Sequence, residues 1–129
     1  MATITEDYVS FETAKLLREK GFDEKTLSYY EDGILYHGDW FEWNRSPLGQ
    51  IAAPSQAMAM KWLREVHGLH ISLEPCYDYD SMHVVFLAFV QNIADVHEFM
   101  DGRKNVVSYP NAEKCYELAI KYCLENVIK

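Results

Sequence analysis

Two histidines and a cysteine lie near one another in the sequence in a pattern that could bind a metal ion. His67 and His70 are three residues apart, and Cys76 follows six residues later. A structural zinc site needs about four converging nitrogen or sulfur ligands, and no Cys-x-x-Cys pair is present to supply the others. We therefore expect no metal site, and we expect His67 to interact with the carbonyl groups at the end of a helix.

Two acidic residues and two cysteines are the other groups that could take part in catalysis. Asp78 and Asp80 could pair their carboxylates, but only one residue separates them in a turn-like segment, where aspartate is a common turn former. Cys115 and Cys123 lie eight residues apart on a predicted helix, where cysteine most often acts as a small buried hydrophobic residue. No nucleophile elbow, phosphate-binding glycine loop or dinucleotide fingerprint occurs. We expect no catalytic residues, no cofactor and no enzymatic activity. A small metal-dependent hydrolase that uses the histidines and aspartates is an alternative.

The densest group of aromatic residues lies between residues 29 and 43. The sequence favours a role for it as part of the core, covering the edge of a sheet. The other interpretation is a binding surface, because tryptophan and tyrosine contribute strongly to interface energies. In that case Trp40, Phe41 and Trp43 are the residues that we expect to form the interaction surface.

Three helices are predicted to position these groups. The first runs from about Phe11 to Lys20 and the second from about Gln56 to His67, and each has a serine before it and a glycine after it. Serine caps a helix start, and glycine adopts the left-handed conformation that ends a helix. The second helix is expected to bury a stripe formed by Ala59, Trp62, Leu63 and Val66. A third helix begins after Pro110-Asn111.

Two β-hairpins are predicted between the helices. The first joins residues 26–30 to 34–37 through Asp32-Gly33, a pair that accepts positive φ angles in a tight turn. The second joins residues 70–77 to 83–91. Residues 83–90 are apolar on both faces, which is typical of a central strand covered on both sides. If helices cover only one face, a second copy of the chain could cover the other, so this strand indicates self-association.

Two segments have no clear regular pattern. Residues 38–49 are interpreted as a loop that carries a short strand, because Ser46-Pro47 and Gly49 interrupt it. Residues 92–107 are interpreted as a loop or a turn of helix that ends at Asp101-Gly102. The predicted fold is a single α+β domain over residues 1–129. It has an antiparallel sheet of about four strands from two hairpins, packed by three helices in the order α-β-β-α-β-β-α.

The chain is acidic, with 20 acidic and 12 basic residues and a net charge of −8. No run of basic residues could bind phosphates, so direct binding of nucleic acid is not expected. Scattered acidic residues favour a role in solubility over the alternative, an acidic DNA mimic that inhibits a DNA-acting host enzyme.

The amino-terminal residues do not resemble a signal peptide, and the longest apolar run, 84–90, is too short to span a membrane. The three cysteines are an odd number without a framework spacing, so we expect reduced thiols and a cytoplasmic protein. No contact with a membrane is expected.

Three helical segments of the chain resemble a family of small uncharacterised proteins encoded in phages and prophages of gut bacteria. The segments are 8–17 with Lys20-Gly21-Phe22, 53–56 with 61–67, and 116–126. The resemblance implies a phage or prophage context in a bacterial or phage-infected cell, and it implies no activity and no site residues. We therefore expect a non-catalytic accessory protein that binds an unknown protein partner and could form a homodimer.

Overall fold

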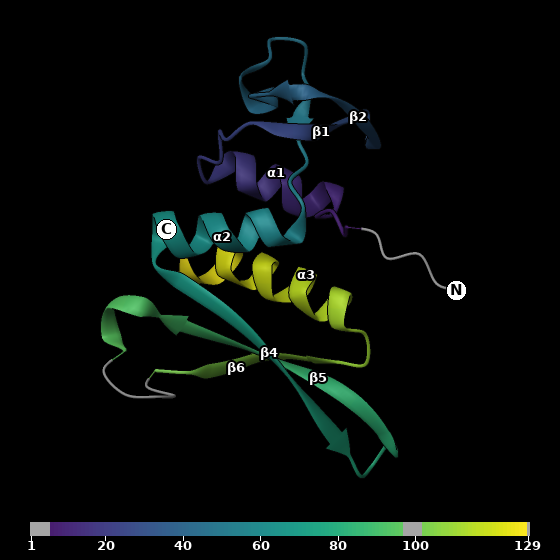
Figure 1. Ribbon diagram of the computed structural model, residues 1–129, viewed down its shortest axis with the longest axis vertical. Helices are drawn as coiled ribbons and strands as arrows, with labels where there is room; N and C mark the ends of the chain where they lie inside the picture. The colour runs from purple at the N-terminus through teal and green to yellow at the C-terminus, as the bar shows by residue number, and fades with distance from the viewer. Residues whose placement is uncertain (1–5, 97–101, 129) are drawn as a thin grey trace. The chain divides into compact units, whose positions relative to one another are not determined.

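The computed structural model describes residues 6–96 and 102–128. The chain divides into two compact units, residues 1–59 and 60–129. The described residues contain three helices and two three-stranded antiparallel sheets (Figure 1). The predicted α+β class is confirmed. The predicted order differs, because each hairpin is followed by one further short strand and the strands form two sheets instead of one. The expectation of a single domain stays a prediction.

The first sheet has the strand order β2-β1-β3. Strands β1 (Thr26–Glu31) and β2 (Ile34–Phe41) form the predicted hairpin, and β3 (Ile51–Ala52) pairs with the other edge of β1. Asp32 and Gly33 have φ angles of 52° and 76°. Positive φ at both central residues is the type I′ geometry, which matches the twist of the two strands. This confirms the turn prediction.

Helix α1 (Phe11–Glu19) packs in the same unit. Its start is capped by Ser10, whose side chain accepts a hydrogen bond from the backbone N–H of Thr13. At its end, Gly21 has a φ of 95°, and the N–H of Phe22 donates to the carbonyl oxygen of Leu17 at 2.9 Å. This bond is the signature of a Schellman motif, so the predicted cap and stop are both confirmed.

The inner face of β1 is joined to the segment before α1. The buried hydroxyl of Tyr30 donates to the carbonyl oxygen of Val9 at 2.7 Å. The Tyr30 ring also contacts the ring of Phe11, with the centroids 5.4 Å apart. These contacts place Tyr30 in the core and leave the opposite face of β1 and β2 for other residues.

Helix α2 (Gln56–His67) has the predicted bounds and crosses the boundary between the two units. The side chain of Ser55 accepts a hydrogen bond from Met58 N–H at its start, and Gly68 follows its end with a φ of 67°. Ala59, Trp62 and Leu63 are buried as predicted. Val66 is 57% exposed, so its predicted burial is wrong. Packing along the apolar stripe stops one turn before the helix ends.

The second sheet has the order β4-β5-β6, with β4 at Leu69–Asp78, β5 at His83–Asn92 and β6 at Lys104–Tyr109. Pro75 lies on the edge strand β4, as expected for a residue without a backbone N–H. Helix α3 (Ala112–Tyr122) packs on this sheet (Figure 1) and continues into a π-helical turn at Cys123–Val127. Its start is capped by Asn111, which accepts from Lys114 N–H at 2.8 Å.

The central position of β5 is confirmed. Helix α3 covers one of its faces, which is the case in which we expect a second copy of the chain on the other, and that expectation stays a prediction. Ala88 and Val90 are buried on the face that α3 covers. On the opposite face, the guanidinium carbon of Arg103 lies 3.5 Å from the centre of the Phe89 ring, and Arg103 pairs with Glu74 at 2.6 Å. An arginine side chain therefore covers part of the face opposite α3.

Both segments that had no clear pattern contain regular structure. Strand β2 extends to Phe41, and a short 3-10 helix, η1, follows at Trp43–Arg45. In the second segment, a 3-10 turn at Ile93–Asp95 and strand β6 replace the expected loop, and residues 97–101 lie outside the described residues. No helix in the described parts of the chain is long and apolar enough to cross a membrane.

Candidate functional site

Five aromatic residues, Tyr29, Tyr36, Trp40, Phe41 and Trp43, form what we call the aromatic surface. Tyr29 and Tyr36 are direct cross-strand partners, and their rings stack with centroids 5.6 Å apart. The Trp43 ring lies 4.2 Å from Tyr29 and 5.0 Å from Phe41, with Phe41 edge-on to it. Four of the rings thus form a continuous row in the order Tyr36, Tyr29, Trp43, Phe41. Trp40 precedes Phe41 on β2 and makes no ring contact with the described residues.

Gly38 makes room for this row. A Cβ atom at this position would lie 3.1 Å from Cε1 of Tyr29 and 3.3 Å from Cζ2 of Trp43. Both distances are shorter than an ordinary carbon–carbon contact of about 3.5–4.0 Å. The Trp43 ring therefore packs against bare backbone, and any other residue at position 38 would push the two rings aside.

The 3-10 helix η1 is fixed by all three of its residues. The indole N–H of Trp43 donates to the carbonyl oxygen of Thr26 at 2.9 Å. The Asn44 side chain donates to the Phe22 carbonyl oxygen at 2.6 Å and accepts from Ala52 N–H at 2.8 Å. These bonds tie η1 to the end of α1 and to two strands, so the aromatic surface is presented by a rigid platform.

Arg45 completes this anchoring through charge. Its guanidinium group pairs with Asp23 and, at 2.9 Å, with Glu42. The hydrogen bond to Asp23 raises the pKa of Arg45, and the negative charge of Glu42 raises it further. The arginine is exposed, so these pairs contribute orientation more than stability.

The sequence-predicted surface residues fall into two groups. Trp40 is 53% exposed and Phe41 is 45% exposed, whereas Trp43 is half-buried and supports its neighbours. Trp40 lies in an irregular part of β2, where three residues of this strand lie opposite one residue of β1. Sequence reasoning treated the aromatic cluster as either core or surface. The structure divides it, with Tyr30 in the core and Trp40 and Phe41 outside.

The potential metal ligands do not converge. His70 and Cys76 lie on the same strand six residues apart, which separates them by about 20 Å. The ring of His67 packs edge-on against Trp62 at 4.7 Å, and its buried Nε2 makes no hydrogen bond to the described residues. The expected interaction of His67 with helix-end carbonyls is therefore not made through Nε2. Within residues 6–96 and 102–128, no three histidine, cysteine, aspartate or glutamate side chains lie close enough to hold a metal ion.

The other candidate reactive groups have structural roles. The carboxylate of Asp78 accepts a hydrogen bond from Asp80 N–H at 3.1 Å, which confirms its role as a turn former. Cys115 and Cys123 are fully buried, as predicted. Burial raises the pKa of both thiols, that of Cys123 to about 12, which suppresses the reactive thiolate form.

A serine–histidine pair that the sequence did not reveal lies on the other face of the first hairpin. Ser28 Oγ and His37 Nδ1 are 2.6 Å apart, and the ring of Tyr8 lies against His37. Such a pair is the core of many nucleophilic sites. Ser28 is fully buried, however, so its hydroxyl cannot meet a substrate. The bond serves to join β1 and β2.

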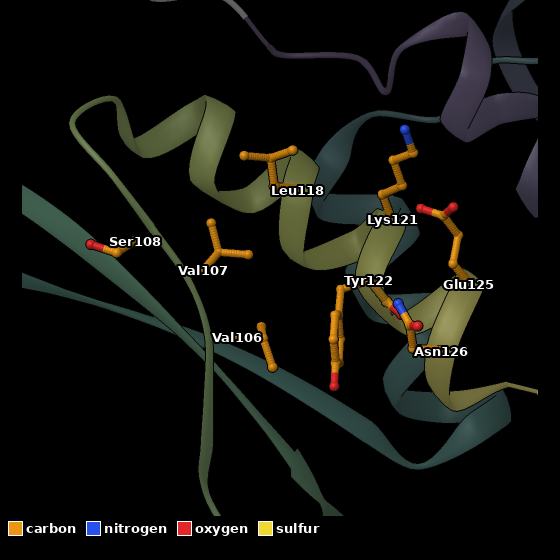
Figure 2. A pocket seen from close by; sticks show the side chains of 8 residues that line it. All are labelled: Val106, Val107, Ser108, Leu118, Lys121, Tyr122, Glu125 and Asn126. Carbon is orange, nitrogen blue, oxygen red and sulfur yellow. The ribbon is translucent and has the colours of Figure 1, made fainter.

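Figure 2 shows an open pocket of about 480 Å³ between β6 and α3. Val107 and Leu118 face each other across it, while Lys121 and Glu125 point away. The hydroxyl of Tyr122, which also lines the pocket, accepts a hydrogen bond from Lys104 at 3.1 Å. The lining contains one serine, Ser108, and no hydrogen bond between its hydroxyl and Lys121 or Glu125 is present among the described residues.

No protein-family model, curated protein or solved structure matches this chain. The resemblance to phage and prophage proteins stays an expectation.

Replacing Gly38 with alanine tests the packing of the aromatic surface. The added methyl group is expected to displace Trp43 and Tyr29, to lower the free energy of unfolding by about 1–3 kcal/mol, and to change the near-ultraviolet circular dichroism of the tryptophans. Gly49→Ala is the control. Gly49 has a φ of 80° but nothing within 4 Å of its Cβ position, so alanine strains the backbone there without touching a ring. A near-ultraviolet spectrum that changes equally in both variants would contradict the packing.

The cysteines predict a pH-dependent stability. The pKa of Cys123 in the folded protein is about 12, against about 8.5 in an unfolded chain. The folded state therefore keeps this proton where the unfolded state loses it. The protonated Cys123 thiol contributes fully to the free energy of unfolding below about pH 8.5. This contribution is lost as the pH rises toward 12, by at most about 1.4 kcal/mol per pH unit. Denaturant unfolding of the wild type and Cys123→Ala between pH 7 and 10.5 should show a shallower decline in the variant. Parallel declines would refute the assignment.

Proposed function

We propose that this protein is a non-catalytic protein-binding module and acts as a phage or prophage accessory protein. In this proposal the aromatic surface contacts a different protein. The observation that carries it is the exposure of Phe41, whose ring meets the anchored Trp43 ring, and of Trp40, the residue before it on β2. Large aromatic side chains that remain in water on a fixed platform are typical of binding surfaces, because tryptophan and tyrosine dominate the energy of many interfaces.

The platform lowers the cost of binding. Ordering a flexible side chain or loop on association costs free energy, roughly 0.5–1.5 kcal/mol for each immobilised side chain. Here Trp43 and Asn44 are already held by hydrogen bonds to Thr26, Phe22 and Ala52. A partner would therefore meet a surface that needs little rearrangement, which supports binding through this face.

The charge around the aromatic surface indicates the chemistry of the partner. Residues 26–44 contain four acidic residues and no lysine or arginine, and Arg45, which follows them, is paired with Asp23 and Glu42. One of them, Asp39, is exposed and adjacent to Trp40. We therefore propose a partner surface that combines apolar side chains with arginine. An arginine stacked on an exposed tryptophan contributes about 0.5–2 kcal/mol.

The biological context in this proposal comes from the sequence resemblance. The expected resemblance of three helical segments to proteins of gut-bacterial phages and prophages supports an action in the cytoplasm of a bacterial or phage-infected cell. A host protein or another phage protein would then be the partner.

Site-specific photo-crosslinking tests the proposed surface. The photoreactive residue p-benzoylphenylalanine replaces Trp40 in one variant and Leu48 in the other, and both chains are expressed in infected bacterial cells. Leu48 is a matched control because it is 75% exposed and belongs to the same unit but not to the aromatic surface. We expect a discrete adduct with a second protein from position 40 only, detected by immunoblotting and mass spectrometry.

The adduct should weaken by about tenfold or more when Phe41→Ala is added, because a central aromatic contact is typically worth at least about 1.4 kcal/mol. It should also weaken with rising salt, because charge attraction is screened. Equal adducts from positions 40 and 48, no adduct from position 40, or an adduct of the chain with itself would each contradict the proposal.

A further inference from the structure

The face of the second sheet that α3 covers continues beyond the helix. In the alternating pattern of the strands, the buried residues Ile71 and Val90 share a face with Tyr77 and Val84. The ten residues of β4 and of β5 span about 33 Å. Helix α3 with its π-helical turn spans only about 24 Å, and Figure 1 shows the end of this hairpin projecting past the helix. At the end of the β4–β5 hairpin, α3 therefore does not cover the sheet face on which it packs.

Five residues at this end form what we call the hairpin-end patch. Each of the five is 39–82% exposed. The patch consists of Tyr77, Tyr79, Met82, Val84 and Tyr109. The rings of Tyr77 and Tyr79 meet edge to face at 4.9 Å, and the Tyr77 hydroxyl lies 3.8 Å from the sulfur of Met82. Val84 is the direct cross-strand partner of Tyr77. These four residues thus form a contiguous cluster. Tyr109 pairs with Phe86, two residues along β5 from Val84, and so belongs to the same face.

We infer that the hairpin-end patch is the contact surface of a homodimer. The occupant is a second copy of this chain, whose own patch packs face to face across a two-fold axis. This inference does not depend on the proposed function, because it uses a different surface in the other unit. Its surface differs from the one that the sequence suggests, because the patch lies on the α3 side of the sheet and not on the opposite face of β5.

The area of the patch supports a second copy. A large aromatic side chain buries about 150–250 Å², so the five residues expose on the order of 500 Å². This is near the upper end for an apolar patch on a monomer, about 300–600 Å². A stable interface buries about 800 Å² on each partner. Two copies of the patch would provide the apolar centre of such an interface, with neighbouring polar residues forming its rim.

Shape and charge also favour self-association. Two sheet faces pack readily at a small angle about 10 Å apart, and a two-fold interface needs the same patch on both partners. The patch contains no charged residue. Asp78 and His83, which are cross-strand partners at the end of the hairpin, belong to the opposite face by alternation. The strand part of the patch would therefore meet its copy without burying a charge, which is costly for an unpaired group. Asp80, which is exposed in the turn between Tyr79 and Met82, must remain in water at the rim of the interface.

The oligomeric state of the full chain tests the inference. Sedimentation velocity between about 1 and 100 µM should show the mass increasing from 15.0 kDa to twice that value. Because each copy carries a net charge of −8, dimerisation should strengthen when salt rises from about 0.05 to 0.5 M and screens the repulsion. Val84→Asp and Tyr79→Ser should each raise the dissociation constant, Val84→Asp by roughly 30-fold or more.

Controls separate this surface from others. Tyr79 is 82% exposed, so Tyr79→Ser should leave the fold intact, as circular dichroism can verify, even if Val84→Asp disturbs the hairpin. Leu48→Ser and Trp40→Ala alter exposed residues of the other unit and should leave the dissociation constant unchanged. A chain that stays monomeric at 100 µM in high salt overturns the inference. So does a dimer that Tyr79→Ser leaves intact, or one that rising salt dissociates.

Discussion

The aromatic surface depends on the absence of a side chain at position 38. Without a Cβ there, the Trp43 ring packs against the β2 backbone and against Tyr29. Its indole N–H can then reach the Thr26 carbonyl oxygen. The position of Trp43 in turn determines where Phe41 lies, because the two rings meet edge to face. The close approach of the Trp43 ring to the backbone at Gly38 thus determines how the rings pack on this face of the first unit, and Trp40 and Phe41 remain exposed to solvent.

Elements that depend on neighbouring residues could be predicted from the sequence. The Asp32-Gly33 turn needs only two residues that tolerate positive φ, and the end of α1 needs only Gly21 and an apolar residue after it. Helix α2 was predicted with its observed bounds because a serine cap, an apolar stripe and a glycine stop agree. The burial of Cys115 and Cys123 follows from their place on an amphipathic helix.

Elements that depend on distant partners could not be predicted. Strand β3 is only two residues long, and β6 begins with Lys104 and Asn105, so neither shows a strand-like pattern by itself. Each becomes a strand because β1 or β5 offers an open edge. The anchors of η1 join residues up to 22 positions apart. For the same reason, the sequence could not decide which aromatic residues are core and which are exposed. Gly38 was the available indication, since a glycine inside a strand often marks a close approach.

The most direct test of this account is hydrogen exchange of the two indole N–H groups of the first unit, measured by NMR on the ¹⁵N-labelled protein. The account predicts strong protection of the Trp43 indole, which is bonded to Thr26, and fast exchange of the Trp40 indole on the exposed part of β2. In Gly38→Ala, protection of Trp43 should fall while Trp40 stays unchanged. Equally fast exchange at both tryptophans in the wild type would contradict the claim that a fixed ring supports an exposed one.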